Sequence, residues 1–427
     1  MSQEINKAEK QDLSLVVQAI GTDLEHTQVR VVASANADML FHYWKVGHFI
    51  LYLQKKEGWG SKVIDNLSKA IRSKYPDKKG YSRRNIFYMC QFASAYPLEV
   101  LKEMDRIDSL LTTPTVEKVL SLTNELNQIV QQPVALIQAT ENQSNTIMQQ
   151  PVAQLEEVTE TLSTIYHCDI SQIEEIFKHS AIVRTNWASH VILLNSKLPL
   201  GECYWYITQA VANGWSRNVL QMQIETNLFA RQIEAKKVNN FAVRLPNPQS
   251  DLANYLMKDP YIFDMMGQTD KMAERDIEKQ LVSHITKYLL EMGSGFAFVA
   301  QQKHFEVGDS DFYADLILYN IQLHAYVVIE LKATPFKPEY MGQLNFYINV
   351  VDDALRGEHD NNTIGLLLCN GGDKVVAQYA LSGYDQPIGV SDYQLSKAIP
   401  ENLKSALPTV EEVEEELSKI VKKGEIV

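Results

Sequence analysis

The chain has 427 residues, of which 45% are hydrophobic and 22% charged, and its formal net charge is −13. This length accommodates two or three domains of ordinary globular composition. No apolar run approaches the ~18 residues of a membrane span, and the polar N-terminus MSQEINKAEKQDLS lacks a signal-peptide core. We therefore expect no membrane partner. The four cysteines are far apart and form no CxxC pair, which excludes an obvious zinc site or disulfide framework and indicates a cytoplasmic location.

Residues 1–111 are predicted to form a helical domain that binds nucleic acid. Within it, the pattern indicates one helix that ends before Pro76 and a second that begins after Ser82 and ends before Pro97. The connection PDKKGY is short and contains Gly80. Two helices joined in this way resemble a helix-turn-helix unit.

Positive charge is concentrated at this connection although the whole chain is acidic. Positions 69–84 hold seven basic residues and one acid, Asp77, so the local net charge is +6. Basic side chains and helix N-termini both favour the phosphates of a nucleic acid. The alternative is a solvated turn between two helices. The residues predicted to contact nucleic acid, called the basic cluster below, are Lys78, Lys79, Arg83 and Arg84.

The middle of the chain is less regular in composition. Residues 112–172 are rich in Gln, Asn, Thr and Ser, which indicates a polar insertion, a linker or a long polar helical excursion. Residues 173–240 are predicted to be a second helical block of the N-terminal domain. Residues 241–269 contain three prolines and are predicted to be a linker.

The last part of the chain changes character. A helix at about 271–292 precedes the strand-like runs FAFVAQQKHFEV, DFYADLILYN, HAYVVIEL and TIGLLLC, and a helix at about 340–355 separates the last two. Residues 270–407 are therefore predicted to be a domain with a mixed central sheet, and residues 408–427 an acidic helix. The predicted fold class is multidomain α+β, with a helical N-terminal region and a C-terminal α/β domain.

Two of these strands carry charged residues where a buried strand normally has apolar ones. Glu330 and Lys332 lie two apart in VVIELK and share one face. Asp315 interrupts YADLILY, and a hairpin through YNIQLHAY would bring it close to Glu330. Two buried carboxylates repel each other, and one lysine offsets only part of that repulsion. The alternative is a structural ion pair with Lys332.

A divalent cation would balance this charge. Oxygen ligands suit Mg²⁺, with Mn²⁺ as a substitute, and such a site indicates metal-assisted attack of water on a phosphodiester. Glu278 lies at the end of an apolar stripe in ERDIEKQLVSHITKYLL and is a candidate supporting ligand; the alternative is a surface acid. Gln343 and Tyr347 are one helical turn apart and are predicted to point together toward the metal or the nucleic acid.

These segments carry a family resemblance. ADLILY and VVIELK, followed by QLNFY, resemble the PD-(D/E)XK nuclease motif and the QxxxY helix of some of its branches, with Ala314 at the usual proline position. The stretches ERDIEKQL, ELKATPFKPEYMGQLNFYINVVDD and NNTIGLLLCN are similar to the YhcG family of bacterial nucleases. YWKVGHFI, GWGSKVIDNL and GYSRRNIFYMCQFASAYP are similar to the N-terminal domain of that family, which is proposed to bind DNA.

The resemblance implies a restriction-endonuclease-like core and a Mg²⁺-dependent nuclease that acts on nucleic acid, with DNA favoured over RNA. Asp315 and Glu330 would hold the metal with the Leu331 carbonyl, and Lys332 would orient the attacking water. Glu278, Gln343 and Tyr347 would support the site. The alternative function is a catalytically silent protein that binds nucleic acid or assembles on a nuclease-like fold, and the sequence leaves a homo-oligomer open.

Overall fold

The computed structural model describes residues 31–53, 62–110, 114–131, 153–264, 291–293 and 295–396. Three predictions lie outside these residues: Glu278 as a supporting ligand, the helix at about 271–292 except for its last two positions, and an acidic helix at 408–427. The chain divides into two units, one made of Met1–Leu110 and Glu125–Ile207 and the other of Leu111–Asn124 and Thr208–Val427. Each unit is described by itself.

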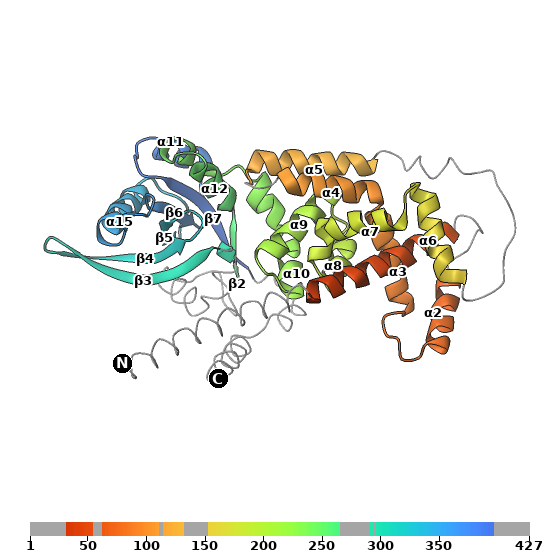
Figure 1. The fold of residues 1–427 in the computed structure, drawn as a ribbon. Coiled ribbons are helices and arrows are strands. Elements are labelled where there is room, and N and C mark those ends of the chain that lie inside the picture. Colours follow the sequence, from red (N-terminus) through yellow and green to blue (C-terminus); the bar gives the residue numbers. More distant parts are fainter. Residues whose placement is uncertain are drawn as a thin grey trace, which may run out of the picture. The chain divides into compact units, whose positions relative to one another are not determined.

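The first unit is helical (Figure 1). Residues 31–53 form its first described helix. The helices that follow in the chain are α2 (Lys62–Lys74), α3 (Arg83–Ala95), α4 (Leu98–Leu110), α5 (Val116–Gln131), α6 (Ala153–Tyr166), α7 (Ile170–His179), the 3-10 helix η2 (Ala181–Arg184), α8 (Trp187–Ser196) and α9 (Leu200–Ala212). The division between the units falls within α5 and α9, so α5 up to Asn124 and α9 from Thr208 belong to the second unit. Large aromatic side chains fill the core, where Trp44, Phe92 and Phe177 are fully buried. Trp44 also donates its indole N–H to the Tyr96 carbonyl at 2.7 Å, so this core polar group is satisfied.

Helices α2 and α3 confirm the predicted pair of helices around a short turn. Helix α2 ends at Lys74, before Pro76, and α3 ends at Ala95, before Pro97. Ser82 is the N-cap of α3, and its hydroxyl accepts from the Asn85 N–H at 3.2 Å. Gly80 has a φ of +100°, a left-handed conformation that costs glycine little.

Helices also occupy part of the polar region predicted at 112–172. Helices α5 and α6 lie within it, and residues 132–152 between them fall outside the described part of the chain. The described residues of this region are therefore mainly helical, which was one of the predicted alternatives.

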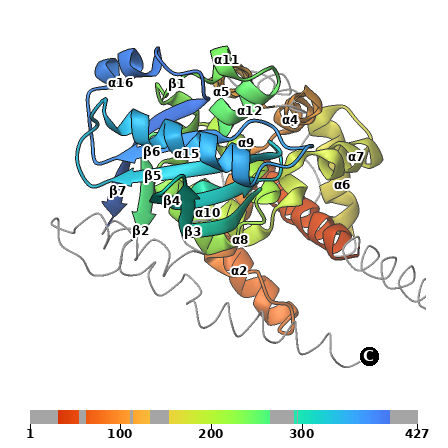
Figure 2. The same cartoon turned by 90° about the vertical axis from the view of Figure 1, so that its left-hand side faces the viewer.

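The second unit is built on a mixed seven-stranded sheet (Figures 1 and 2). Its strand order is β1-β7-β6-β5-β4-β3, and β2 pairs in parallel with β7. Strands β3, β4 and β5 are antiparallel neighbours, whereas β5, β6 and β7 run parallel. The elements are α10 (Arg217–Glu225), the π-helix η3 (Ala230–Glu234), β1 (Val238–Asn239), α11 (Phe241–Arg244), α12 (Gln249–Leu256), β2 (Tyr261–Asp264), β3 (Phe296–Val307), β4 (Ser310–Asn320), β5 (Ala325–Lys332), α15 (Tyr340–Ala354), β6 (Ile364–Cys369), α16 (Lys374–Leu381) and β7 (Ile388–Ser396). The predicted mixed sheet is confirmed.

Helices cover both faces of this sheet. One apolar cluster joins α15 and α16 to one face, and a second joins α11 and α12 to the other. Helix α15 lies against β5 and β6, close enough that a Cβ added at Gly365 would come within 2.5 Å of Ile348 Cδ1 and 3.1 Å of Leu344 Cδ2. The glycine on β6 thus permits a short distance between α15 and the sheet.

The segment predicted to be a linker, 241–269, is not an irregular connection where it is described. It forms α11, α12 and β2, and β2 pairs with β7 from Tyr261 to Asp264. The prolines misled the prediction because they stand between these elements: Pro248 is the N-cap of α12, and Pro260 directly precedes β2. No helix in the described residues is long and apolar enough to cross a membrane.

Candidate active site

The ladder between β4 and β5 brings the two predicted carboxylates together. Its register pairs Leu316 with Ile329, so one step further along Asp315 stands opposite Glu330. Leu316 and Ile329 belong to the apolar cluster under α11 and α12. Val328, two residues before Glu330, belongs to the cluster under α15, and the charges of Glu330 and Asp315 both act on Tyr347 of α15, so the two carboxylates face that helix. The predicted hairpin is confirmed, and its register continues to facing positions for Asp315 and Glu330.

Glu330 and Lys332 form a buried ion pair at the C-terminal end of β5. The Lys332 Nζ donates to Glu330 Oε1 at 2.8 Å. Glu330 has no exposed surface, and Lys332 is 7% exposed. A buried charge is tolerated when it is paired and hydrogen-bonded, so each of these two residues makes the burial of the other possible.

Asp315 is held by two hydrogen bonds from neighbouring strands. Its Oδ2 accepts from the Leu331 backbone N–H at 3.1 Å, and its Oδ1 accepts from Gln302 Nε2 at 3.2 Å. Gln302 has a φ of +44°, so the β3 backbone is left-handed at the position across from Asp315. The sequence reasoning missed Gln302, because nothing in its own strand pattern marks this conformation.

Helix α15 adds Gln343 and Tyr347 to the same place, as predicted. The Gln343 side chain is hydrogen-bonded to the Tyr347 hydroxyl. Burial is the main cause that raises the pKa of Tyr347, and the negative charges of Glu330 and Asp315 raise it further. Tyr347 is 5% exposed, so its hydroxyl lies in the core, where the charges of both carboxylates act on it.

A second aromatic residue of α15, Tyr340, borders Lys332 and was also missed. The Lys332 Nζ lies 5.5 Å from the centre of the Tyr340 ring, and Lys337 Nζ lies 5.9 Å from it. The Tyr340 hydroxyl is hydrogen-bonded to Thr334 Oγ1 at 2.6 Å. The ring therefore holds one side of the Lys332 ammonium while Glu330 holds another. The aromatic residue that ends the run ELKATPFKPEY is the sequence signal that could have indicated it.

The donor set of Asp315 and Glu330 fits a hard divalent cation. Mg²⁺ typically binds one or two carboxylates and completes its octahedron with water and phosphate oxygens. Lys332 balances one of the two carboxylates, so a net negative charge remains at the buried Glu330 and the half-buried Asp315. Within the described ranges no group of three or more His, Cys, Asp or Glu side chains could hold a metal. A cation here would therefore rest on two side chains and on backbone, water or substrate oxygens.

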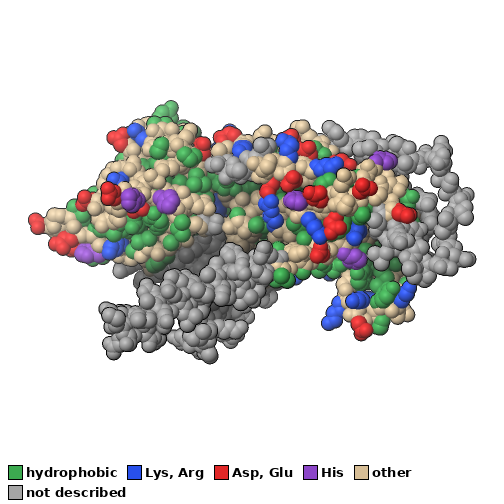
Figure 3. Space-filling view, in the orientation of Figure 1, with side chains coloured by type: hydrophobic (Ala, Val, Ile, Leu, Met, Phe, Trp, Pro, Cys, Tyr) green, Lys and Arg blue, Asp and Glu red, His purple; other side chains and the backbone are tan. Residues whose placement is uncertain are grey.

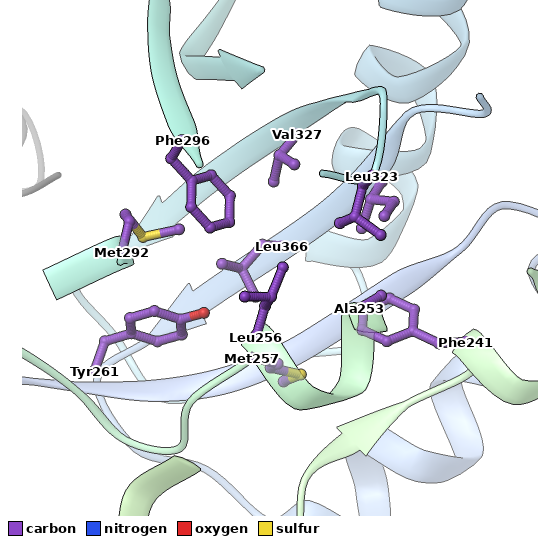
Figure 4. Close-up of a pocket in the computed structure, with 11 residues that line it drawn as sticks. Phe241, Ala253, Leu256, Met257, Tyr261, Met292, Phe296, Leu323, Val327 and Leu366 are labelled. Atoms are coloured by element: carbon purple, nitrogen blue, oxygen red, sulfur yellow. The ribbon is translucent and has the colours of Figure 1, made fainter. Parts of the chain in front are cut away.

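An apolar cavity lies on the opposite face of the sheet and is separate from this site (Figure 4). Its volume is about 30 Å³. It is lined by Phe241, Ala253, Leu256, Met257, Tyr261, Met292, Phe296, Leu323, Val327, Ile364 and Leu366. This lining offers one hydroxyl and no charged group, in contrast to the site that contains Asp315, Glu330 and Lys332.

The basic cluster is exposed at the α2–α3 turn of the helical unit. All four of its side chains are exposed, and blue side chains gather around this turn in Figure 3. Arg83 pairs with Asp65 at 2.9 Å, and Arg84 donates to the Tyr88 hydroxyl at 3.3 Å. The two lysines directly precede the left-handed glycine, so the turn presents its cations outward.

Comparisons with known proteins assign the two ends of the chain. Residues 254–408 match the family model of the YhcG PDDEXK nuclease domain, and residues 19–122 match that of the DUF1016 N-terminal domain. A curated relative, "Putative nuclease YhcG" of Escherichia coli (strain K12), is 28% identical over 213 residues, which are 50% of this chain. The chain spans 57% of the length of that relative.

Among solved structures, the crystal structure of a repair endonuclease from Pyrococcus abyssi is 15% identical, with a TM-score of 0.21 over 30% of this chain and 49% of that one. Asp315, Glu330 and Lys332 lie within residues 254–408, which match the nuclease domain, and the basic cluster lies within residues 19–122, which match the N-terminal domain. The chain therefore carries a region that matches the YhcG PDDEXK nuclease domain family at residues 254–408 and a region that matches the DUF1016 N-terminal domain family at residues 19–122.

Proposed function

We propose that this chain is a Mg²⁺-dependent nuclease that hydrolyses phosphodiester bonds, with DNA as its substrate and Mn²⁺ as an alternative metal. One observation carries the proposal: Asp315 stands opposite Glu330 on adjoining strands, and Glu330 is paired with Lys332. Two carboxylates and an ammonium at one end of a strand pair are the groups that metal-assisted hydrolysis needs.

Asp315, Glu330 and the Leu331 carbonyl are the groups proposed to hold the metal. In an antiparallel ladder the N–H and C=O of one residue point to the same neighbour. Because the Leu331 N–H donates to Asp315, its carbonyl also faces that side of β5. When bound, Mg²⁺ lowers the pKa of a coordinated water and stabilises the charge that develops on the phosphate.

The remaining site residues are proposed to position the attacking water and the substrate and to stabilise negative charge. Lys332, held by Glu330 and the Tyr340 ring, is proposed to orient the attacking water and to stabilise the additional negative charge of the transition state. Gln343 and Tyr347 are proposed to hold the substrate side of the site, and Glu278 to support the metal.

The helical unit is proposed to capture the nucleic acid through the basic cluster. Its exposed cations suit phosphate contacts, which supply affinity without sequence preference. DNA is proposed because the family's N-terminal domain is itself proposed to bind DNA. A cytoplasmic location is proposed because none of the four cysteines forms a disulfide.

Calorimetric titration of the full chain with Mg²⁺ and Mn²⁺, combined with cleavage of defined DNA and RNA structures, tests this function. We expect saturable metal binding and cleavage in the wild type and the loss of both in Asp315→Asn. Asp353→Asn is the matched control, because Asp353 is an exposed acid on α15. Nucleic-acid binding that is indifferent to metal, with no cleavage of any substrate, would identify a silent binding protein instead.

A further inference from the structure

The hairpin of β3 and β4 extends beyond the rest of the sheet. The ladder between β4 and β5 ends at Leu316, whereas β3 and β4 remain paired as far as Val307 and Ser310. In Figure 1 this hairpin projects away from the other strands. Asp315 lies where the hairpin leaves the sheet, so the projecting part begins at the proposed active site.

Two aromatic rings stand side by side on this projection. Tyr313 and His304 are partners in the β3–β4 register, and their ring centroids are 5.0 Å apart at an interplanar angle of 33°. Tyr313 is 49% exposed. The His304 ring is fixed by a hydrogen bond of 2.6 Å between its Nε2 and Asp311 Oδ1. The strand rise of about 3.3 Å per residue puts the Tyr313 Cα roughly 7 Å from that of Asp315.

This pair of rings is not needed to hold the hairpin. Phe312 packs against Phe346 of α15 with ring centroids 4.5 Å apart, and its register partner Phe305 is buried in the same cluster. The hairpin is therefore anchored through Phe312 and Phe305. The Tyr313 backbone reaches the active site, where it is hydrogen-bonded to the Tyr347 hydroxyl, while the Tyr313 ring turns away from the α15 cluster that contains Phe312 and Ala314.

The charge of the hairpin tip determines what kind of contact it can make with a nucleic acid. Residues 303–311 contain one lysine and three acids, Glu306, Asp309 and Asp311, so the tip carries a net charge of −2 with His304 neutral. A phosphate backbone would be repelled here. An aromatic ring can instead stack on a base, a contact worth about 1–3 kcal/mol per base in proteins that bind single strands.

We propose that Tyr313, backed by His304, is a stacking platform for an unpaired base next to the scissile phosphate. The bases of an intact duplex are already stacked on one another and offer no free face. The preferred substrate class is therefore single-stranded nucleic acid, or a duplex with an unpaired end. This inference rests on the proposed nuclease function and adds the substrate class to it.

Binding measured without catalysis tests the platform. Fluorescence anisotropy in EDTA uses the full chain with a labelled DNA single strand, the same strand in a blunt duplex, and a duplex with a single-stranded tail. We expect Tyr313→Ala to weaken binding of the single strand and the tailed duplex about tenfold or more, and to leave blunt-duplex affinity unchanged. Tyr313→Phe should bind as the wild type does. Tyr379→Ala is the matched control, because Tyr379 is 78% exposed on α16.

Salt dependence separates stacking from charge. Tyr313→Ala should lower affinity without changing the slope of log K against log salt, since stacking releases no counterions. A parallel arm with the RNA strand decides whether the platform accepts both sugars. If Tyr313→Ala does not fold, as judged by its circular-dichroism melt, Tyr313→Leu replaces it, because leucine fills space without a π face.

The proposal is overturned if Tyr313→Ala weakens all three ligands equally, if Tyr379→Ala has the same effect, or if the wild type does not prefer an unpaired strand. None of these readings depends on cleavage. Absent metal binding and absent turnover would remove the nuclease function and leave the stacking result intact, so the two failures are distinguishable.

Discussion

Replacing Lys332 separates its part in catalysis from its part in the fold. Lys332 is 7% exposed, and its Nζ lies 2.8 Å from Oε1 of the fully buried Glu330. The Lys332→Met substitution keeps most of the side-chain volume but removes the ammonium that pairs with the buried Glu330. Breaking a buried pair in this way costs about 3–5 kcal/mol. We expect the free energy of unfolding of the metal-free protein to fall by this amount.

Two further measurements show whether the removal of the Lys332 charge causes this loss of stability. Saturating Mg²⁺ should restore about 2–3 kcal/mol when its concentration is near a hundred times Kd, because it binds the folded state and supplies positive charge. The double variant Glu330→Gln, Lys332→Met should lose less stability than Lys332→Met alone, since no buried charge is left unpaired. Urea unfolding followed by circular dichroism, with and without Mg²⁺, reports both.

The catalytic effect is measured by single-turnover cleavage of a labelled substrate. Lys332→Met should lower the rate by about 10²–10⁴-fold, the usual scale for one positioned proton-transfer group. Substrate affinity should change little, because the interaction is made mainly in the transition state. Lys337→Met is the control, since Lys337 is more than half exposed. Unchanged stability in Lys332→Met would refute the reasoning about the pair. Unfolding of that variant together with no metal-dependent cleavage in the wild type would make the pair purely structural.

Three other predictions concern charge, packing and pH. Replacing the basic cluster with glutamine should weaken DNA binding and flatten its salt dependence by about 0.9 for each phosphate that the variant no longer neutralises; unchanged affinity and slope in anisotropy titrations would leave the helical unit without this role. Tyr340→Ala should lower kcat about three- to thirtyfold because the Lys332 ammonium then lacks the ring beside it, whereas Tyr340→Phe should not; an equal decrease in both variants would assign the effect to the hydroxyl. Burial lowers the pKa of Lys237 to about 7, so the unfolded chain binds more protons between about pH 7 and 10.4 and the free energy of unfolding should rise with pH across that window. Lys237→Met should flatten this rise in urea titrations, and the same slope in variant and wild type would contradict it.

Much of the candidate site could be predicted from alternation and turn length alone. Glu330 and Lys332 are two residues apart in an apolar strand, and a short connection leads back to Asp315, so a hairpin register followed directly from the sequence. Gln302 and Tyr340 could not be found in this way. The contact of Gln302 depends on a left-handed residue within β3, and that of Tyr340 depends on how the loop after β5 folds back over Lys332.

The strands at the β7 end of the sheet were the least predictable part of the fold. Strand β7, with the sequence IGVSDYQLS, contains glycine, serines and an acid and was not predicted as a strand. Strand β2 follows Pro260 and was assigned to a linker, yet it pairs with β7. Both strands are specified by their neighbours in the sheet more than by their own propensities. A domain boundary at residue 270, which stays a prediction, would separate β2 from its partner.

Gly365 on β6 affects the position of α15, although β6 contributes no residue to the candidate site. A methyl group there would meet Ile348 and Leu344, and α15 would have to rise or tilt to accommodate it. Because the backbone of a helix is held by its own hydrogen bonds, such a movement carries Gln343 and Tyr347 along with it. A side chain at position 365, on a strand that contributes no residue to the candidate site, would therefore displace Gln343 and Tyr347 of α15 relative to Asp315 and Glu330.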